Sequence, residues 1–129
     1  MAEISVGIYH GRALQLSNAM QVCRDDLRSY AWAAALLAVH SAISYCDAVL
    51  LKLNGRRSDS QDHGQAIAAV TKACKKRKIH TDGIKHLDKL VSAKTDISYG
   101  DEQVDNQRVE VLCVAAERFQ TWAERLLRG

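Results

Sequence analysis

The feature that most constrains this chain is an apolar run from Ala31 to Leu51, in which almost every residue is apolar or small. The strongly polar exceptions are His40 and Asp47. A helix that is apolar on nearly all sides is typical of one enclosed by other helices. The chain also contains no proline, so no residue in it enforces a helix break. We therefore predict a central helix from about residue 29 to residue 54, wrapped by the rest of the chain.

Four other segments have the apolar spacing of packed helices, in steps of three and four residues: 11–28, 61–78, 84–91 and 104–126. With 129 residues, of which 47% are apolar and 26% charged, the chain is long enough for one domain with a real core. We predict an all-α fold, an antiparallel up-and-down bundle of four to five helices, as a single domain over residues 1–129. Residues 1–10 alternate apolar residues too briefly for a strand and are predicted to be a flexible arm.

Several residues predict where helices begin and end. Gly55 is suited to the left-handed cap that ends the central helix. Ser58, Asp59 and Ser60 are competent N-caps for the next helix, and Thr81 for a shorter fourth one. The stretch 94–106 is predicted to be a polar break before the last helix.

Composition narrows the possible functions. The net charge of +3 is small, but segment 72–94 holds eight Lys or Arg against two Asp. The KKRK run at 75–78 is predicted to be a solvated helix end, because no interleaved aromatic residues offer base stacking. The four cysteines are dispersed and lack a CxxC pair, which favours reduced core cysteines and a cytoplasmic protein. We expect no membrane span, because His40 and Asp47 lie within the apolar run, and no metal or cofactor, because ligand spacing is absent.

A polar groove is predicted beside the central helix. His40 and Asp47 are seven residues apart and point the same way from a helix. Arg57 and His63 follow soon after Gly55. A carboxylate in an apolar helix is costly unless it is paired. Asp47 would therefore either accept from Arg57, Ser58 or Ser60 and fix the loop, or orient His40 or His63 for acid–base chemistry.

The chain resembles the HEPN domain (higher eukaryote and prokaryote nucleotide-binding) over about residues 12–127. The residues that carry the resemblance are HSAISYCDAVLLKLNGRRSDSQDH at 40–63, LDKLVSAKTDISYGD at 87–101 and AAERFQTWAERLL at 115–127. The resemblance implies a small helical bundle that forms homodimers. It also implies one of two roles: a metal-independent ribonuclease with Arg followed four to six residues later by His, or a nucleotide-binding or partner subunit without that motif.

At the family's usual motif position this chain has Lys94 and Tyr99 in place of arginine and histidine. Lys94 could stabilise a phosphate, but Tyr99, with an ordinary pKa near 10, is a poor base at neutral pH. The sequence therefore favours a non-catalytic homodimer that binds a nucleotide, RNA or a protein partner. That partner would be the nucleotidyltransferase or the antitoxin of a two-component system. The alternative is a toxin-like ribonuclease that uses Arg57 and His63, which have the right spacing but lie earlier in the chain.

Overall fold

The computed structural model describes residues 2–58, 63–101 and 103–129, with the backbone alone for residues 2–5 and 63. Within these residues the chain forms five helices and no strand. The all-α bundle predicted from the sequence is confirmed. The helices are α1 (Ala2–Arg24), α2 (Leu27–Asn54), α3 (His63–Lys76), α4 (Ile84–Tyr99) and α5 (Asn106–Arg128).

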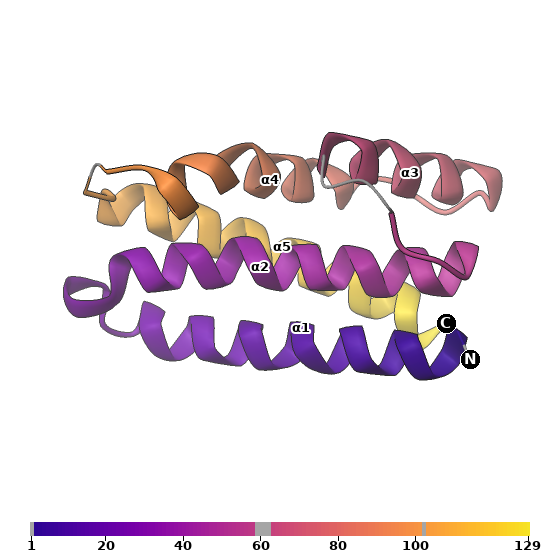
Figure 1. Ribbon diagram of the computed structural model, residues 1–129, viewed down its shortest axis with the longest axis horizontal. Helices are drawn as coiled ribbons and strands as arrows, with labels where there is room; N and C mark the ends of the chain where they lie inside the picture. The colour runs from indigo at the N-terminus through magenta and orange to yellow at the C-terminus, as the bar shows by residue number, and fades with distance from the viewer. Residues whose placement is uncertain (1, 59–62, 102) are drawn as a thin grey trace.

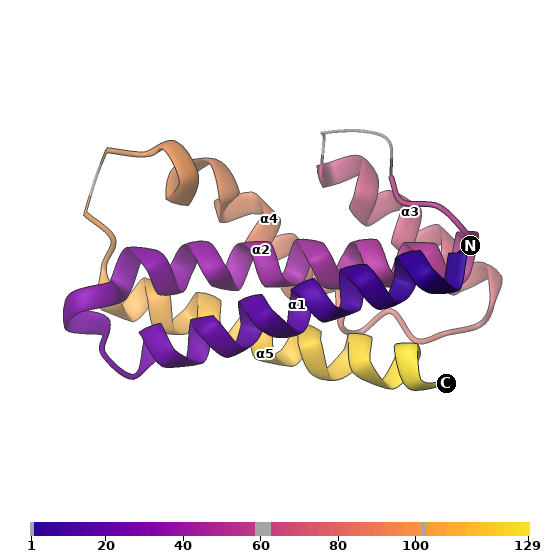
Figure 2. The same cartoon turned by 60° about the horizontal axis from the view of Figure 1, so that its bottom comes forward.

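Helix α2 is the centre of the bundle and contacts each of the other four helices. Helix α1 packs along it as the first arm of a helical hairpin, and α5 runs behind both (Figure 1). Helices α3 and α4 follow one another along a further side of α2, which Figure 2 shows from a second angle. Helices α1, α2, α4 and α5 alternate in direction, whereas α3 runs the same way as α2.

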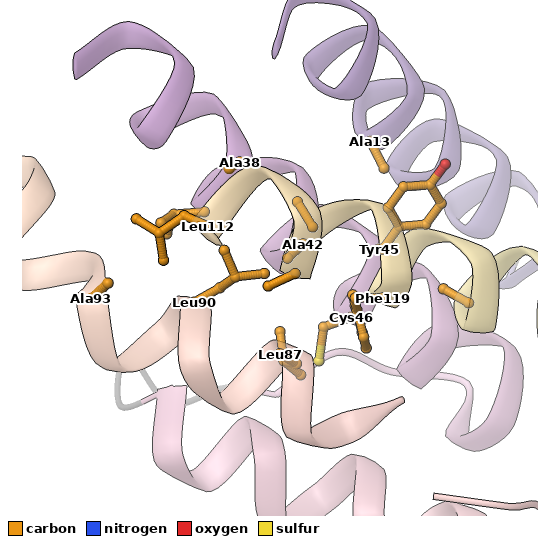
Figure 3. Close-up of a cluster of buried hydrophobic side chains, with 14 of the residues drawn as sticks. Ala13, Ala38, Ala42, Tyr45, Cys46, Leu87, Leu90, Ala93, Leu112 and Phe119 are labelled. Atoms are coloured by element: carbon orange, nitrogen blue, oxygen red, sulfur yellow. The ribbon is translucent and has the colours of Figure 1, made fainter. Parts of the chain in front are cut away.

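Small residues on α2 allow this close packing. Ala34, Ala35, Ala38 and Ala42 are almost completely buried, so neighbouring backbones can approach the α2 axis. Larger side chains from the surrounding helices fill the space between them. Figure 3 shows part of this core, with the α4 side chains Leu87 and Leu90 packed near α2. The bulkiest side chains with almost no exposure are Tyr45, Phe119, Met20, Leu50, Leu87 and Leu90.

The ends of α2 follow from local chemistry. Gly55 has a left-handed φ of 76°, as predicted, and its N–H donates to the Leu51 carbonyl at 2.9 Å. At the other end the Asp26 side chain accepts from the Ser29 N–H at 3.3 Å. Tyr30 has non-helical angles, so the first turn is offset by a kink from the rest of the helix.

Two predicted boundaries differ from the structure, and a third is not tested by the described residues. The predicted arm at residues 1–10 is instead helical from Ala2 onward, as the first part of α1. Thr81 does not cap α4 with its side chain: Gly83 precedes the helix, and the Ile84 N–H donates to the Thr81 carbonyl. Of the N-caps predicted for α3, Ser58 precedes the helix, and Asp59 and Ser60 lie outside the described residues.

Helix α4 also continues through 94–99, where a polar break was predicted. Two contacts explain the extension. The Ile97 side chain is 1% exposed and anchors the last turn in the core. The Trp32 indole N–H donates to the Ile97 carbonyl at 2.7 Å. Ala93 and Ile97 continue the apolar spacing from Leu90 in steps of three and four, and the contact with α2, which is remote in the sequence, supports the same turn.

The apolar length of α2 and the cysteines have ordinary structural explanations. By length and composition α2 could cross a membrane, but 67% of its most apolar window is buried inside the bundle. Cys46, Cys74 and Cys113 are buried free thiols, and Cys23 is half-buried. Burial raises the pKa of Cys46 to about 12, so its thiol stays protonated and weakly reactive at neutral pH.

Candidate functional site

Asp47 lies among apolar side chains on the face of α2 covered by α3 and α4. Its side chain is 20% exposed and borders a small cavity of about 20 Å³, lined also by Ile43, Cys46, Ala66, Leu87 and Val91. A space of this size holds at most a water molecule. Burial raises the pKa of Asp47, and the positive charge of Arg57 opposes that shift. Asp47 therefore lies in tightly packed surroundings that leave no room for a ligand larger than water.

Arg57 folds back from the loop toward Asp47. Its Nη1 atom lies 3.9 Å from Asp47 Oδ2, and its guanidinium lies over the Tyr9 ring at 4.6 Å from the centroid. Arg12 lies near the same ring, at 5.1 Å. The predicted pairing of Asp47 with Arg57 is present, and the loop is held against both α1 and α2. This arrangement favours the structural interpretation, in which Asp47 and Arg57 fix the loop.

Of the other residues of the predicted groove, three lie farther along α2 and α4, and the side chain of the fourth, His63, is not described. His40 is half-buried on α2, about 10 Å along the helix axis from Asp47. The backbone of His63 begins α3, but its side chain lies outside the described residues. Lys94 is half-buried on α4, whereas Tyr99 is 77% exposed at the end of that helix. Tyr99 is about 12 Å along α4 from Val91, which borders the Asp47 cavity, so the structure does not bring Tyr99 to Asp47.

A larger site lies between α4 and α5 and was missed by the sequence analysis. We call it the α4–α5 groove, a cavity of about 540 Å³. Helix α4 contributes Lys85, His86 and Lys89, and α5 contributes Arg118. Its lining also includes Gln107, Glu110, Val111, Val114 and Ala115.

The positive charges of this groove all lie close enough to His86 to affect its pKa. Burial lowers the pKa of His86, and the charges of Lys85, Arg118 and Lys89 lower it further, with Asp82 acting in the opposite direction. Glu110 is already bound by the Arg24 guanidinium, which lowers the pKa of its carboxyl. Among the described residues, Lys85, Lys89 and Arg118 have no carboxylate partner. The groove can therefore accept an anion without first breaking an ion pair.

The sequence contained part of this signal. Lys85 and Lys89 are four apart, on one face of a helix, inside the segment already known to have excess positive charge. Arg118 follows about thirty residues later, and no local pattern connects it to them. The contiguous run at 75–78 is the more conspicuous positive segment in the sequence, whereas the groove forms where α5 crosses α4.

Another polar cluster joins α1, α2 and α5. Glu124 Oε2 accepts from the Tyr45 hydroxyl at 2.7 Å and lies 2.7 Å from His10 Nε2. Gln120 Nε2 donates to the Tyr45 hydroxyl, and Ser17 donates to Gln120 Oε1. Each of these polar groups thus has a partner within the bundle, which is the arrangement expected of a structural network.

Within the described residues, no group of three or more His, Cys, Asp and Glu side chains is placed to hold a metal ion. No model of a known protein family matches this chain, and no curated protein matches it.

Proposed function

We propose that this protein is a non-catalytic, HEPN-like subunit that binds a nucleotide or RNA through its phosphates in the α4–α5 groove. The observation that supports the proposal is the convergence of Lys85, Lys89 and Arg118, without carboxylate partners among the described residues, on one cavity. Lysine and arginine are the usual phosphate-binding side chains. The volume of about 540 Å³ is within the range of small-ligand sites.

The apolar side of the groove suits a ligand that is more than a bare anion. Val111, which is 47% exposed, and Val114 lie beside the cations. A nucleotide could place its phosphates near Lys85 and Lys89 and its ribose or base against these side chains. The proposal does not use Arg57, because Asp47 and Tyr9 already engage its guanidinium.

Binding can be tested by fluorescence anisotropy with a fluorescein-labelled RNA 12-mer and with ATP as competitor. We expect Lys85→Gln/Lys89→Gln to weaken RNA binding at least about tenfold, since each lost charge–phosphate contact is worth about 1 kcal/mol or more. The matched control is Lys75→Gln/Lys76→Gln, which removes the same charge from the exposed end of α3. Equal losses for the two pairs would mean diffuse charge attraction and would contradict a groove site.

A ribonuclease is the second candidate, and one observation favours testing it in the same groove. The lowered pKa of His86 keeps its imidazole neutral at pH 7, as a general base requires, beside cations that could stabilise a phosphorane. The purified protein should be incubated with RNA in EDTA, together with His86→Ala for this groove and the double variant Arg57→Ala/His63→Ala for the pair with the family's motif spacing. If the unaltered protein cleaves RNA and either variant does not, the protein is a ribonuclease and the non-catalytic proposal is wrong. The absence of cleavage in all three proteins, with binding retained, is the expected result.

The homodimer, and the nucleotidyltransferase or antitoxin partner, belong to the same proposal and stay predictions, because the structure describes one chain. Sedimentation velocity of the purified protein tests the homodimer directly.

A further inference from the structure

From a second cavity we infer a binding site for a small amphipathic monoanion, a carboxylate with an aliphatic or aryl body. The cavity lies at the end of the bundle where α2 and α5 end and the segment between α3 and α4 crosses them; we call it the end pocket. Its volume is about 870 Å³. Its apolar walls are Leu53, Ile79, Trp122 and Leu126. The inference is independent of the function proposed for the α4–α5 groove.

The Trp122 wall of the end pocket is held in place from three sides. Its indole N–H donates to the His80 carbonyl at 2.9 Å. Its ring stacks on Phe119 with centroids 5.5 Å apart. A Cβ atom placed on Gly83 would overlap the Trp122 side chain, so the ring lies directly against the backbone there. The indole N–H is satisfied and the ring is fixed, which leaves a preformed apolar surface for a ligand.

The two ends of the pocket wall are tied together as well. Lys52 Nζ donates to the carbonyls of Leu126 and Leu127, at 3.0 and 2.7 Å, so α2 is joined to the end of α5. Arg77 donates to the Leu53 carbonyl and thereby joins α3 to the end of α2. Lys52 is therefore already committed to backbone acceptors.

Arg125 is the cation left for a ligand. It lines the end pocket, is exposed, and has no carboxylate partner among the described residues. A guanidinium beside an apolar wall suits a carboxylate with a hydrophobic body, since it can donate two parallel hydrogen bonds to that group. Asp82 also lines the pocket, and its negative charge partly offsets the positive charges there, so the end pocket attracts highly charged anions less strongly than the α4–α5 groove. The charges thus favour a monoanion over a polyphosphate, which separates this site from the α4–α5 groove.

Octanoate is a suitable probe, followed by the two indole N–H signals in ¹⁵N–¹H NMR spectra of the whole protein. Trp32 and Trp122 are the two tryptophans of the chain, so Trp32 is an internal control, and Trp32→Phe assigns the signals. We expect a saturable shift of the Trp122 signal with the Trp32 signal unchanged. Arg125→Gln should weaken octanoate at least about tenfold, and 1-octanol, which lacks the charge, should bind Arg125→Gln and the unaltered protein equally.

The matched control is Arg128→Gln, which removes the same charge one turn away, from a side chain outside the pocket lining. Three results with octanoate would overturn the inference: no saturable Trp122 shift, equal shifts of both indoles, or equal octanoate affinity with and without Arg125. A Trp122 shift produced by ATP with the same Arg125 dependence would also overturn it, by assigning the pocket to phosphates. Lys85→Gln/Lys89→Gln should leave octanoate binding unchanged, so this test and the RNA test can fail separately.

Discussion

Asp47 and Glu124 show how differently two partly buried carboxylates can be accommodated. Burial tends to raise the pKa of each. For Glu124 the hydrogen bonds from Tyr45 and His10, together with the electrostatic effects of His10 and Arg128, outweigh burial, and its pKa is lowered. Among the described residues Asp47 has one loose ion-pair partner, Arg57, and its pKa stays raised. The Asp47–Arg57 pair could be predicted because the two residues are ten positions apart, on either side of the helix end at Gly55. The Glu124 cluster could not, because its partners are far apart in the chain.

Replacing Asp47 tests this difference. A pKa raised above the ordinary value of 3.8 means that the native state favours the protonated acid. The stability that the protonated Asp47 side chain contributes is therefore fully present below its ordinary pKa. It is lost as the pH rises through the raised pKa of the folded state. We expect Asp47→Asn to match the unaltered protein at about pH 4 and to be more stable at about pH 7, by up to about 1 kcal/mol.

Thermal unfolding followed by circular dichroism across that pH range measures the difference. Asp88→Asn, on the exposed side of α4, is the control and should show no such trend. A variant that loses stability relative to the unaltered protein as the pH rises would mean that the ion pair with Arg57 outweighs burial.

At the scale of elements, α5 packs closely against the start of α4 because residue 83 is a glycine. Gly83 has ordinary right-handed angles, so alanine would suit its backbone. The space does not allow it, because Trp122 occupies the position of the added carbon. The importance of Gly83 thus comes from packing, which its sequence neighbourhood does not reveal. The last turn of α4 likewise has one contact that its own sequence does not reveal, the hydrogen bond from the Trp32 indole to the Ile97 carbonyl.

Gly83→Ala should therefore destabilise the protein, by about 1–3 kcal/mol, because the Trp122 ring or the start of α4 must move. Gly7→Ala, in an exposed part of α1 where nothing lies near the added carbon, should instead stabilise it by about 0.5–1 kcal/mol. Urea unfolding of both variants gives the two free energies. Equal effects at the two positions would show that Trp122 adapts readily.

At the scale of the whole molecule, the small net charge of +3 conceals an uneven distribution. The cations of the α4–α5 groove are concentrated on one side of the bundle, and Arg24 holds Glu110, the acid in the groove lining, in an ion pair. The bundle itself could be predicted from apolar spacing, since each helix repeats its own pattern. The groove could not, because it exists where two helices cross, and no single segment contains it.

The groove proposal has a measurable consequence for salt. With three cations at phosphates, the logarithm of the RNA association constant should fall with the logarithm of salt concentration with a slope of about −2. Lys85→Gln/Lys89→Gln should make the slope shallower, with a magnitude of about 1 or below. Anisotropy titrations at several salt concentrations give both values, and a slope near zero for the unaltered protein would contradict phosphate binding in the groove.

The hairpin of α1 and α2 has a consequence for how the protein is made. These two consecutive helices pack along their length and are joined by a turn at Asp25 and Asp26, so closing their interface costs little chain entropy. Interfaces of this local kind form early. On the ribosome the hairpin would therefore assemble while α5 is still unsynthesised. The buried ring of Tyr45 and the alanine face of α2 would meanwhile be open to solvent or to a chaperone, until the last helix arrives and covers them.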